Sequence, residues 1–196
     1  MTDWKQEWRE VIDAEGTDFS DGQVHYGADP VEASTIRRYL EPLEFDCALH
    51  YDAKTARQHG YADIIAPYTA TMQWAMPPMW SPGDPPLFTD DSRDAQPARS
   101  PIDNQDFPLG PKTTGYFATD MEMDFVRPVT VGERLGRRGH RLVSCTPKET
   151  TVGRGAFMKW ESEIVDANGE VVMRMRTGTY AYQPHPPSAH DSEDNA

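Results

Sequence analysis

The sequence predicts an α+β fold in which one long apolar helix is wrapped by a curved antiparallel β-sheet. Residues 64–83 carry no charge between Asp63 and Asp84, although charged residues make up 26% of the chain. From residue 115 onward, apolar residues recur with a period of two, which is typical of strands that bury one face. Helical patterns precede this region, so helix and sheet occupy separate parts of the chain, as in the α+β class.

The composition bounds the protein's class. A chain of 196 residues fits a single domain with a real core. The net charge of -13 argues against a nucleic-acid partner, because phosphate binding depends on Lys and Arg. Only Cys47 and Cys145 occur and no apolar segment follows Met1, so we expect no disulfide framework and a cytoplasmic location. The apolar stretch contains four prolines and is too short to cross a membrane.

Residues 1–43 predict two helices, and residues 24–26 a short strand between them. Asp29, Pro30 and Glu32 supply a cap, a proline suited to the first helical position and a capping-box glutamate, which together indicate a helix over 30–41. The apolar faces are Trp4, Trp8, Val11 and Ile12 in the first helix, and Ile36, Tyr39, Leu40 and Leu43 in the second.

Two further helices follow. Asp52 can cap a helix of about two turns, and Gly60 suits the left-handed residue that ends it. Thr69 can cap the central helix, which we expect to reach Met76 or Trp80 and to be packed on all sides.

Residues 77–112 contain nine prolines and little apolar periodicity. A run of this kind inside a compact domain is typical of a functional lid or an insert. We therefore expect one domain over residues 1–183 with a lid at 77–112, and a disordered tail over 184–196 that is rich in Pro, Ser and acids.

The second half predicts four antiparallel strands. Asn168-Gly169 predicts a hairpin with a type I′ turn, in which both central residues have positive φ. Such a sheet has edges to cover, so we expect pairing with a second subunit. The strands are expected over residues 116–127, 133–144, 156–164 and 171–182.

Candidate chemistry clusters around the start of the central helix. His50 lies near Asp46, and an imidazole beside a carboxylate is a common acid/base pair. Tyr68 and Thr69 stand where a helix start offers N–H donors to a carbonyl oxygen that becomes negative. A helix cap or a surface pair explains the same spacing.

Residues 45–72 resemble the MaoC-like hydratase/dehydratase family, which has the hot-dog fold. Its (R)-specific enoyl-CoA hydratases carry D-x-N-P-x-H, a small residue six positions after the His, and then G-F-x-x-x-I-A-H-G. Here His50 falls on the motif histidine, Ala56 falls on the small residue, and residues 60–67 follow in step. Residues 125–133, FVRPVTVGE, are similar to the family's F-x-x-P-V-x-x-G-D.

The sequence departs from the family at two places. Phe45 stands where the motif Asp is expected, with Asp46 one position off, and Cys47-Ala48 replace Asn-Pro. The helix entry reads Ala-Pro-Tyr-Thr instead of Ala-His-Gly, which is similar to the N-terminal, dehydratase-like MaoC subfamily. In paired hot-dog proteins of this kind, one half supplies the Asp/His dyad and the other makes room for a bulky acyl group.

The resemblance implies hydration of a trans-2-enoyl-CoA, or dehydration of a 3-hydroxyacyl-CoA, without a cofactor other than the coenzyme A of the substrate. The chain is then either a subunit that shapes the acyl pocket beside a catalytic MaoC-like partner, or a self-sufficient homodimer that uses His50 and Asp46. The residues expected to contact substrate are Tyr68, Thr69, Met72, Trp74 and Met76.

The arginine-rich stretch 134–141 stands out in an acidic protein. It could contact the phosphates of coenzyme A or form a solvated strand face. The histidines show no metal-ligand spacing, so we expect no metal site.

Overall fold

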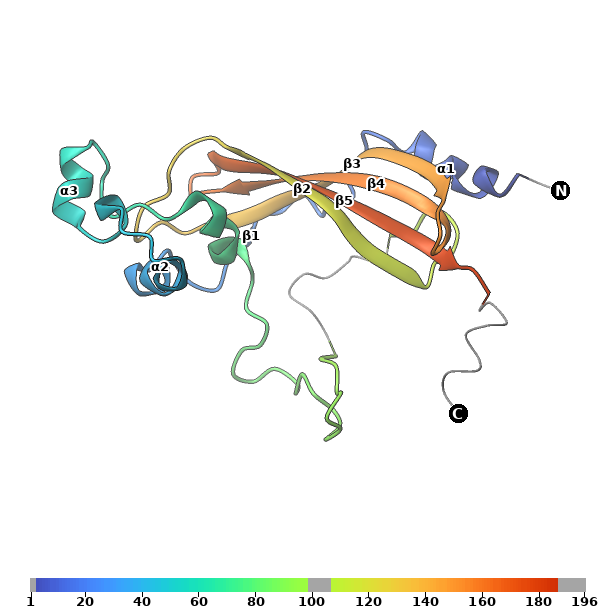
Figure 1. The fold of residues 1–196 in the computed structure, drawn as a ribbon, viewed down its shortest axis with the longest axis horizontal. Helices are drawn as coiled ribbons and strands as arrows, with labels where there is room; N and C mark the ends of the chain where they lie inside the picture. Colours follow the sequence, from blue (N-terminus) through green and yellow to red (C-terminus); the bar gives the residue numbers. More distant parts are fainter. Residues whose placement is uncertain (1–2, 99–106, 187–196) are drawn as a thin grey trace.

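The computed structural model describes residues 3–98 and 107–186, and its central element is a five-stranded antiparallel sheet in the order β1-β3-β4-β5-β2. Figure 1 shows the strands as one long twisted layer with helices gathered at its two ends. The strands are β1 (His25–Tyr26), β2 (Gly115–Phe125), β3 (Gly136–Glu149), β4 (Gly153–Val165) and β5 (Val171–Pro184). The helices are η1 (Trp4–Trp8), α1 (Arg9–Asp13), α2 (Ala33–Leu40), η2 (Glu41–Leu43), η3 (Ala48–His50), α3 (Ala53–Gln58) and η4 (Tyr68–Ala75), where η marks a 3₁₀-helix.

The predicted α+β class and the four predicted long strands are confirmed. In β4 every second residue from Ala156 to Ile164 is buried and the residues between them are half-buried, as the period of two requires. The hairpin at Asn168-Gly169 is also confirmed, but the type I′ turn is wrong. Gly169 has a φ of 82°, whereas Glu44 is the one non-glycine residue with positive φ in the described chain. Asp166 shapes this loop instead, because its carboxylate accepts from the N–H groups of Asn168 at 2.8 Å and Glu170 at 2.9 Å.

Two separate hydrophobic clusters pack on the sheet. The first joins α2 and η4 to one end of the strands, with Ile36, Leu40 and Trp74 among its buried members. The second joins η1 and α1 to the other end through Trp8 and Val11, which confirms the apolar face predicted there. Leu43 was expected on the apolar face of the second helix, but it is 63% exposed because the chain has already turned into η2.

The central apolar stretch forms the eight-residue 3₁₀-helix η4 and not a long helix. Pro77 and Pro78 stop it early, because they lack the N–H that another turn would need. Pro67 occupies the cap position without a side-chain bond, so Thr69 does not cap. The expectation of packing on all sides is also wrong, since Tyr68, Thr69 and Gln73 are exposed.

The start signals of the other helices had mixed outcomes. Asp52 caps α3 by accepting from the Lys54 N–H at 2.9 Å, and Gly60 has a φ of 91°, both as predicted. The helix predicted over 30–41 begins later, at Ala33, with Glu32 at the cap position, so Asp29 is not its cap.

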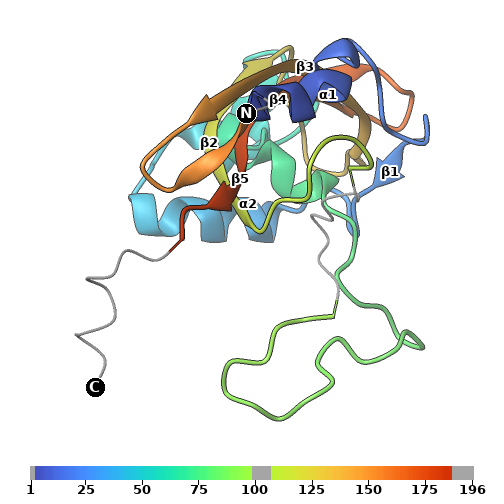
Figure 2. The same ribbon diagram turned by 90° about the vertical axis from the view of Figure 1, so that its right-hand side faces the viewer.

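Residues 77–98 leave the body as a long arm (Figure 2). This arm and residues 107–112 contain turns but no helix or strand, and a role as a lid stays a prediction. The chain returns to the sheet at Phe107, whose ring lies 5.1 Å from that of Trp160. Of the predicted tail, β5 includes residue 184, and residues 187–196 lie outside the described part. Among the described residues, no helix is long and apolar enough to span a bilayer.

Candidate functional site

His50 lies half-buried at the end of η3, and its ring is oriented by the backbone. Its Nδ1 lies 2.7 Å from the carbonyl oxygen of Ile65. A carbonyl oxygen can only accept, so Nδ1 carries the proton in the neutral ring. Nε2 is then left with a lone pair, the state that a general base needs.

The segments that carry the family motifs meet around this histidine. Ile65 donates its N–H to the carbonyl of Leu49 at 3.1 Å, which ties η3 to the strand-like residues before η4. On the other side, Ile65 forms an isolated antiparallel bridge with Thr130, and the Ala66 N–H donates to the Val129 carbonyl at 2.7 Å. The stretches 60–67 and 125–133 are therefore neighbours in space, although about sixty residues separate them in the sequence.

The structure does not pair Asp46 with His50. Asp46 is exposed, and within the described chain no hydrogen bond or ion pair joins the two residues. The Phe45 ring lies 5.7 Å from the imidazole instead, and Tyr51 holds this turn by donating its hydroxyl to the Phe45 carbonyl at 2.8 Å. Asp52 is engaged as the α3 cap, where the Thr55 hydroxyl and the Lys54 N–H lower the pKa of its carboxyl group. A catalytic role for His50 and Asp46 stays a prediction.

Tyr68 and Thr69 stand at the exposed entrance of η4. The Tyr68 ring is 43% exposed and lies 5.0 Å from the ring of Phe125 at the end of β2. The Thr69 hydroxyl lies 2.9 Å from that of Tyr39, so one of these two groups donates to the other. The N–H groups at the start of a helix have no partner within it, and this entrance can therefore donate to a ligand.

The other three predicted contact residues lie deeper. Trp74 is buried and donates its indole N–H to Glu32 at 3.3 Å. Met72 packs against the same cluster, and the carbonyl of the half-buried Met76 accepts from the Ala28 N–H at 3.0 Å. The chain approaches η4 so closely here that a Cβ on Gly27 would lie 1.9 Å from the Trp74 carbonyl oxygen. Substrate contact by these residues stays a prediction. The contacts that the structure shows for them hold η4 in place.

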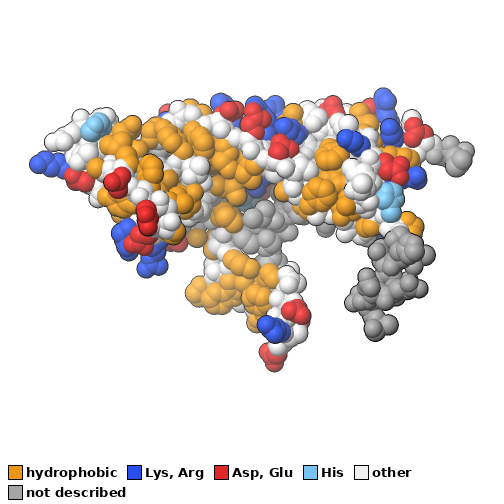
Figure 3. Space-filling view, viewed as in Figure 1, with side chains coloured by type: hydrophobic (Ala, Val, Ile, Leu, Met, Phe, Trp, Pro, Cys, Tyr) orange, Lys and Arg blue, Asp and Glu red, His pale blue; other side chains and the backbone are white. Residues whose placement is uncertain are grey.

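A strip of exposed apolar side chains along β2 was missed in the sequence. Tyr116, Met121 and Phe125 point to the same face of the sheet, and Phe125 connects the strip to Tyr68. Figure 3 shows hydrophobic side chains gathered on the side of the molecule that carries η4 and β2. The alternation of apolar and acidic residues in YFATDMEMDF is the signal that could have revealed a strand exposed on both faces.

The arginine side chains of residues 134–141 form hydrogen bonds and ion pairs with other residues of the same chain. Arg134 donates to the Gly27 carbonyl at 3.2 Å and the half-buried Arg137 donates to Ser162 at 3.2 Å, while Arg138 pairs with Glu163. The His140 ring stacks on Trp160 with 4.2 Å between centroids, and burial together with nearby Arg137 lowers its pKa. These contacts favour a structural strand face for this stretch. The described residues contain no cluster of three His, Cys, Asp or Glu that could hold a metal ion.

Comparison with known proteins places this geometry in a family. The family of the FAS1-like dehydratase domain region matches residues 20–175. The "Probable enoyl-CoA hydratase alpha subunit" of Thermomonospora curvata is 25% identical over 165 residues, which cover 83% of this chain and 48% of that protein. The chain therefore spans about half the length of this relative.

Solved structures share the fold. A chain of the ChsH1-ChsH2 complex from Mycobacterium tuberculosis superposes with a TM-score of 0.60 at 19% identity, covering 94% of this chain and 98% of that chain. A MaoC-like dehydratase gives a TM-score of 0.50 at 18% identity, covering 83% of this chain and 42% of that one. The match over residues 20–175 shows that the chain belongs to the family of the FAS1-like dehydratase domain region, and its curved five-stranded sheet together with the structural matches shows the hot-dog fold.

Proposed function

We propose that the chain is one subunit of an (R)-specific enoyl-CoA hydratase or 3-hydroxyacyl-CoA dehydratase, in which it shapes the acyl pocket beside a catalytic MaoC-like partner. The proposal rests on one observation: within the described chain His50 has no carboxylate bonded to it, so the Asp/His dyad is incomplete in this chain. The Phe45 ring lies 5.7 Å from the imidazole of His50, and the exposed Asp46 makes no hydrogen bond or ion pair with it among the described residues.

The partner would supply the acid and base. Its carboxylate and imidazole would activate water for addition at C3 of the enoyl thioester, and a proton would be delivered to C2. This chain would contribute the entrance of η4 and the rings of Tyr68 and Phe125 to the wall of the acyl pocket. The T. curvata relative is named as an alpha subunit, and the M. tuberculosis structure is a complex, which supports a role within an assembly.

The acyl group is proposed to be bulky. The arm of residues 77–98 leaves the body of the domain and exposes Trp80 and Phe88, which could cover a large ligand. A complex that hydrated short enoyl thioesters as fast as bulky ones would exclude this part of the proposal.

The alternative is a self-sufficient homodimer. The oriented tautomer of His50, with its Nε2 lone pair available, favours this reading. Asp46 would then act from a distance, or after a rearrangement of the turn at residues 45–47.

One assay separates the two functions. The chain is purified alone and together with a MaoC-like protein encoded beside it, and the loss of enoyl absorbance is followed. Activity only in the mixture, insensitive to His50→Ala in this chain, is the expected result. Activity of the isolated chain that His50→Ala removes would refute the subunit role and establish the alternative.

A further inference from the structure

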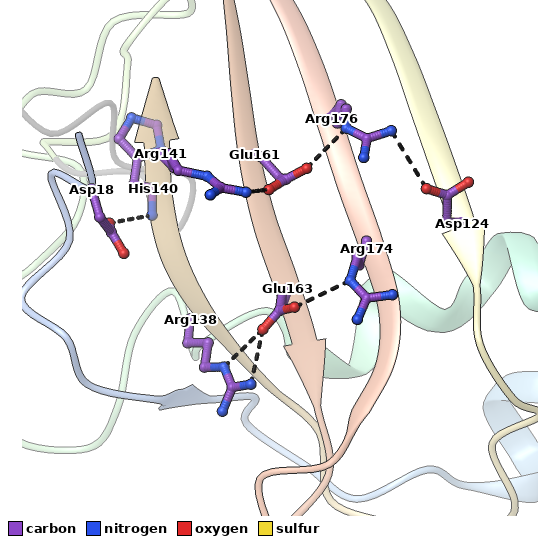
Figure 4. A network of polar contacts seen from close by, with 9 residues as sticks. All are labelled: Asp18, Asp124, Arg138, His140, Arg141, Glu161, Glu163, Arg174 and Arg176. Carbon is purple, nitrogen blue, oxygen red and sulfur yellow. Dashed lines mark hydrogen bonds and ion pairs between the residues drawn. The ribbon is translucent and has the colours of Figure 1, made fainter. Parts of the chain in front are cut away.

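One face of the sheet carries a chain of ion pairs that crosses four strands (Figure 4). Arg141 of β3 pairs with Glu161 of β4, and Glu161 accepts from Arg176 of β5 at 2.9 Å. Arg176 then reaches two acids of β2, Asp124 at 3.5 Å and Glu122 at 3.6 Å. The charge therefore alternates from strand to strand, positive on β3, negative on β4, positive on β5 and negative on β2.

A second row runs beside the first. Arg138 of β3 pairs with Glu163 of β4 at 2.8 Å, and Glu163 pairs with Arg174 of β5 at 3.3 Å. In the strand register, Arg174 lies opposite Asp124 of β2. The first row thus ends on acids of β2, and the second ends on Arg174, which lies opposite one of the same acids, so an alternating pattern calls for a cation beyond β2.

The acids of β2 pair with cations of the strands on one side of it: Glu122 and Asp124 with Arg176 of β5, and Asp120 with Lys159 of β4 at 3.2 Å. The side chains of Asp120, Glu122 and Asp124 are 51%, 54% and 56% exposed, whereas Glu161 inside the ladder is 13% exposed. We call this set Asp120, Glu122 and Asp124 the acidic row of β2.

β2 is also the open edge of the sheet. It pairs with β5 on one side, and within the described chain no strand pairs with its other side, as is typical of an edge that can accept another strand. The opposite edge is covered by the chain itself, because Asp18 bridges Arg141 and β1 pairs with Gly136 and Arg137.

Pairing of β2 with its own copy would place the acidic rows against each other. A two-fold axis normal to the sheet sets residues on the same face opposite one another across an antiparallel pair. Centred on Glu122, it places that residue against its own copy and Asp120 against Asp124. A shift by one residue in either direction still opposes two pairs of acids, and like charges directly opposite each other destabilise a sheet.

We propose that the open edge of β2 pairs with a strand of a different hot-dog subunit, one that presents Lys or Arg opposite Glu122 and Asp124, and that the acidic row rejects a second copy of this chain. The other face of β2 carries Tyr116, Met121 and Phe125, so the same partner meets an apolar strip that extends the core. The inference relies on the proposed function only in taking the partner to be a hot-dog subunit. Its test measures association of subunits and not hydration of a substrate.

The test uses the full chain as its own probe. Sedimentation equilibrium is measured for the wild type, for Glu122→Gln/Asp124→Asn, and for a mixture of wild type with Glu122→Lys/Asp124→Lys. The matched control is Glu7→Gln/Glu10→Gln, which changes the net charge equally on the exposed surface of η1 and α1 at the far end of the sheet. Circular dichroism checks that each variant is folded.

The wild type and the control are expected to be monomeric at about 0.1 M NaCl. The amide variant is expected to self-associate about tenfold more tightly than the wild type, since the like-charge pairs are removed. The wild type mixed with the lysine variant should form a one-to-one complex that weakens at about 1 M NaCl, whereas self-association of the wild type should strengthen as salt screens the repulsion.

The lysine variant adds positive charge beside Arg174 and Arg176 and could therefore fail to fold. In that case the comparison of the amide variant with the wild type and the control still decides the test. A wild-type dimer that is stable at low salt and unaffected by Glu122→Gln/Asp124→Asn would overturn the proposal. So would equal self-association of the amide variant and the Glu7/Glu10 control.

Discussion

Replacement of Arg127 by methionine tests the ionic contact that fixes the loop after β2. The guanidinium of Arg127 lies 2.8 Å from Glu133 and 2.9 Å from Asp166, and the three side chains are 34%, 22% and 9% exposed. Methionine keeps much of the side-chain volume and removes the charge, so two poorly solvated carboxylates lose their cation. Charge-assisted hydrogen bonds contribute roughly 1.5–3 kcal/mol each, and partial exposure reduces this. We expect a loss of about 2–4 kcal/mol in the free energy of unfolding at neutral pH.

The stability difference between wild type and Arg127→Met should depend on pH in a definite direction. Burial alone would raise the pKa of both carboxyl groups, but bonds to Arg127 and to backbone N–H groups lower the pKa of Glu133 and of Asp166 in the folded protein. A carboxyl group with a lowered folded-state pKa stabilises the fold above its unfolded pKa, near 4, and this stabilisation is lost as the pH falls through the folded value. The difference between wild type and Arg127→Met should therefore be largest near pH 7 and shrink below about pH 4.

Urea unfolding followed by tryptophan fluorescence at several pH values measures this difference. Arg174→Met is the matched control, because Arg174 makes a single ion pair within the described chain, at the surface, and its replacement should cost no more than about 1 kcal/mol. A difference for Arg127→Met that matches the control, or that does not change with pH, would refute the reasoning.

Three further predictions concern single contacts. Gly27→Ala places a methyl group 1.9 Å from the Trp74 carbonyl oxygen, so the thermal midpoint should fall by several degrees. Gly22→Ala is the control, because the new methyl group meets no atom within 4 Å. Since Gly22 has a φ of 75°, this control should cost only a backbone strain of about 1 kcal/mol. Trp74→Phe removes the indole bond to Glu32 and should cost about 1–2 kcal/mol in urea unfolding, and a change within error would show that the bond is not needed. Burial, together with Glu15, raises the pKa of Cys145 to about 12, so iodoacetamide near pH 8 should label the half-buried Cys47 first in the native protein, and mass spectrometry showing equal labelling would contradict this.

The strands were predictable because their signal is local. The period of two in residues 156–164 follows from burial of one strand face, and no distant contact changes it. Asp52 was also read correctly, since its cap involves residues two and three positions away.

The missed features depend on distant partners. Glu32, not Asp29, stands at the cap position of α2 without a side-chain bond to the helix N–H groups, and its carboxylate receives the indole N–H of Trp74, 42 positions away. His50 is oriented by Ile65, fifteen residues on, through a carbonyl that no sequence pattern marks. The exposure of β2 follows from its place in the strand order, which strand prediction does not provide.

The division of the interior into two hydrophobic clusters has a consequence for how the molecule comes apart. Trp8 and Val11 belong to a cluster that includes Trp160, but the cluster around Trp74 contains no residue of η1 or α1. Undocking of the N-terminal segment would expose only the far cluster, so we expect two cooperative units of different opening free energy. Amide hydrogens near the far end of β3 and β4 should then exchange through a smaller opening than those beside η4, which leaves the end of the sheet that carries η4 the more persistent part of the native state.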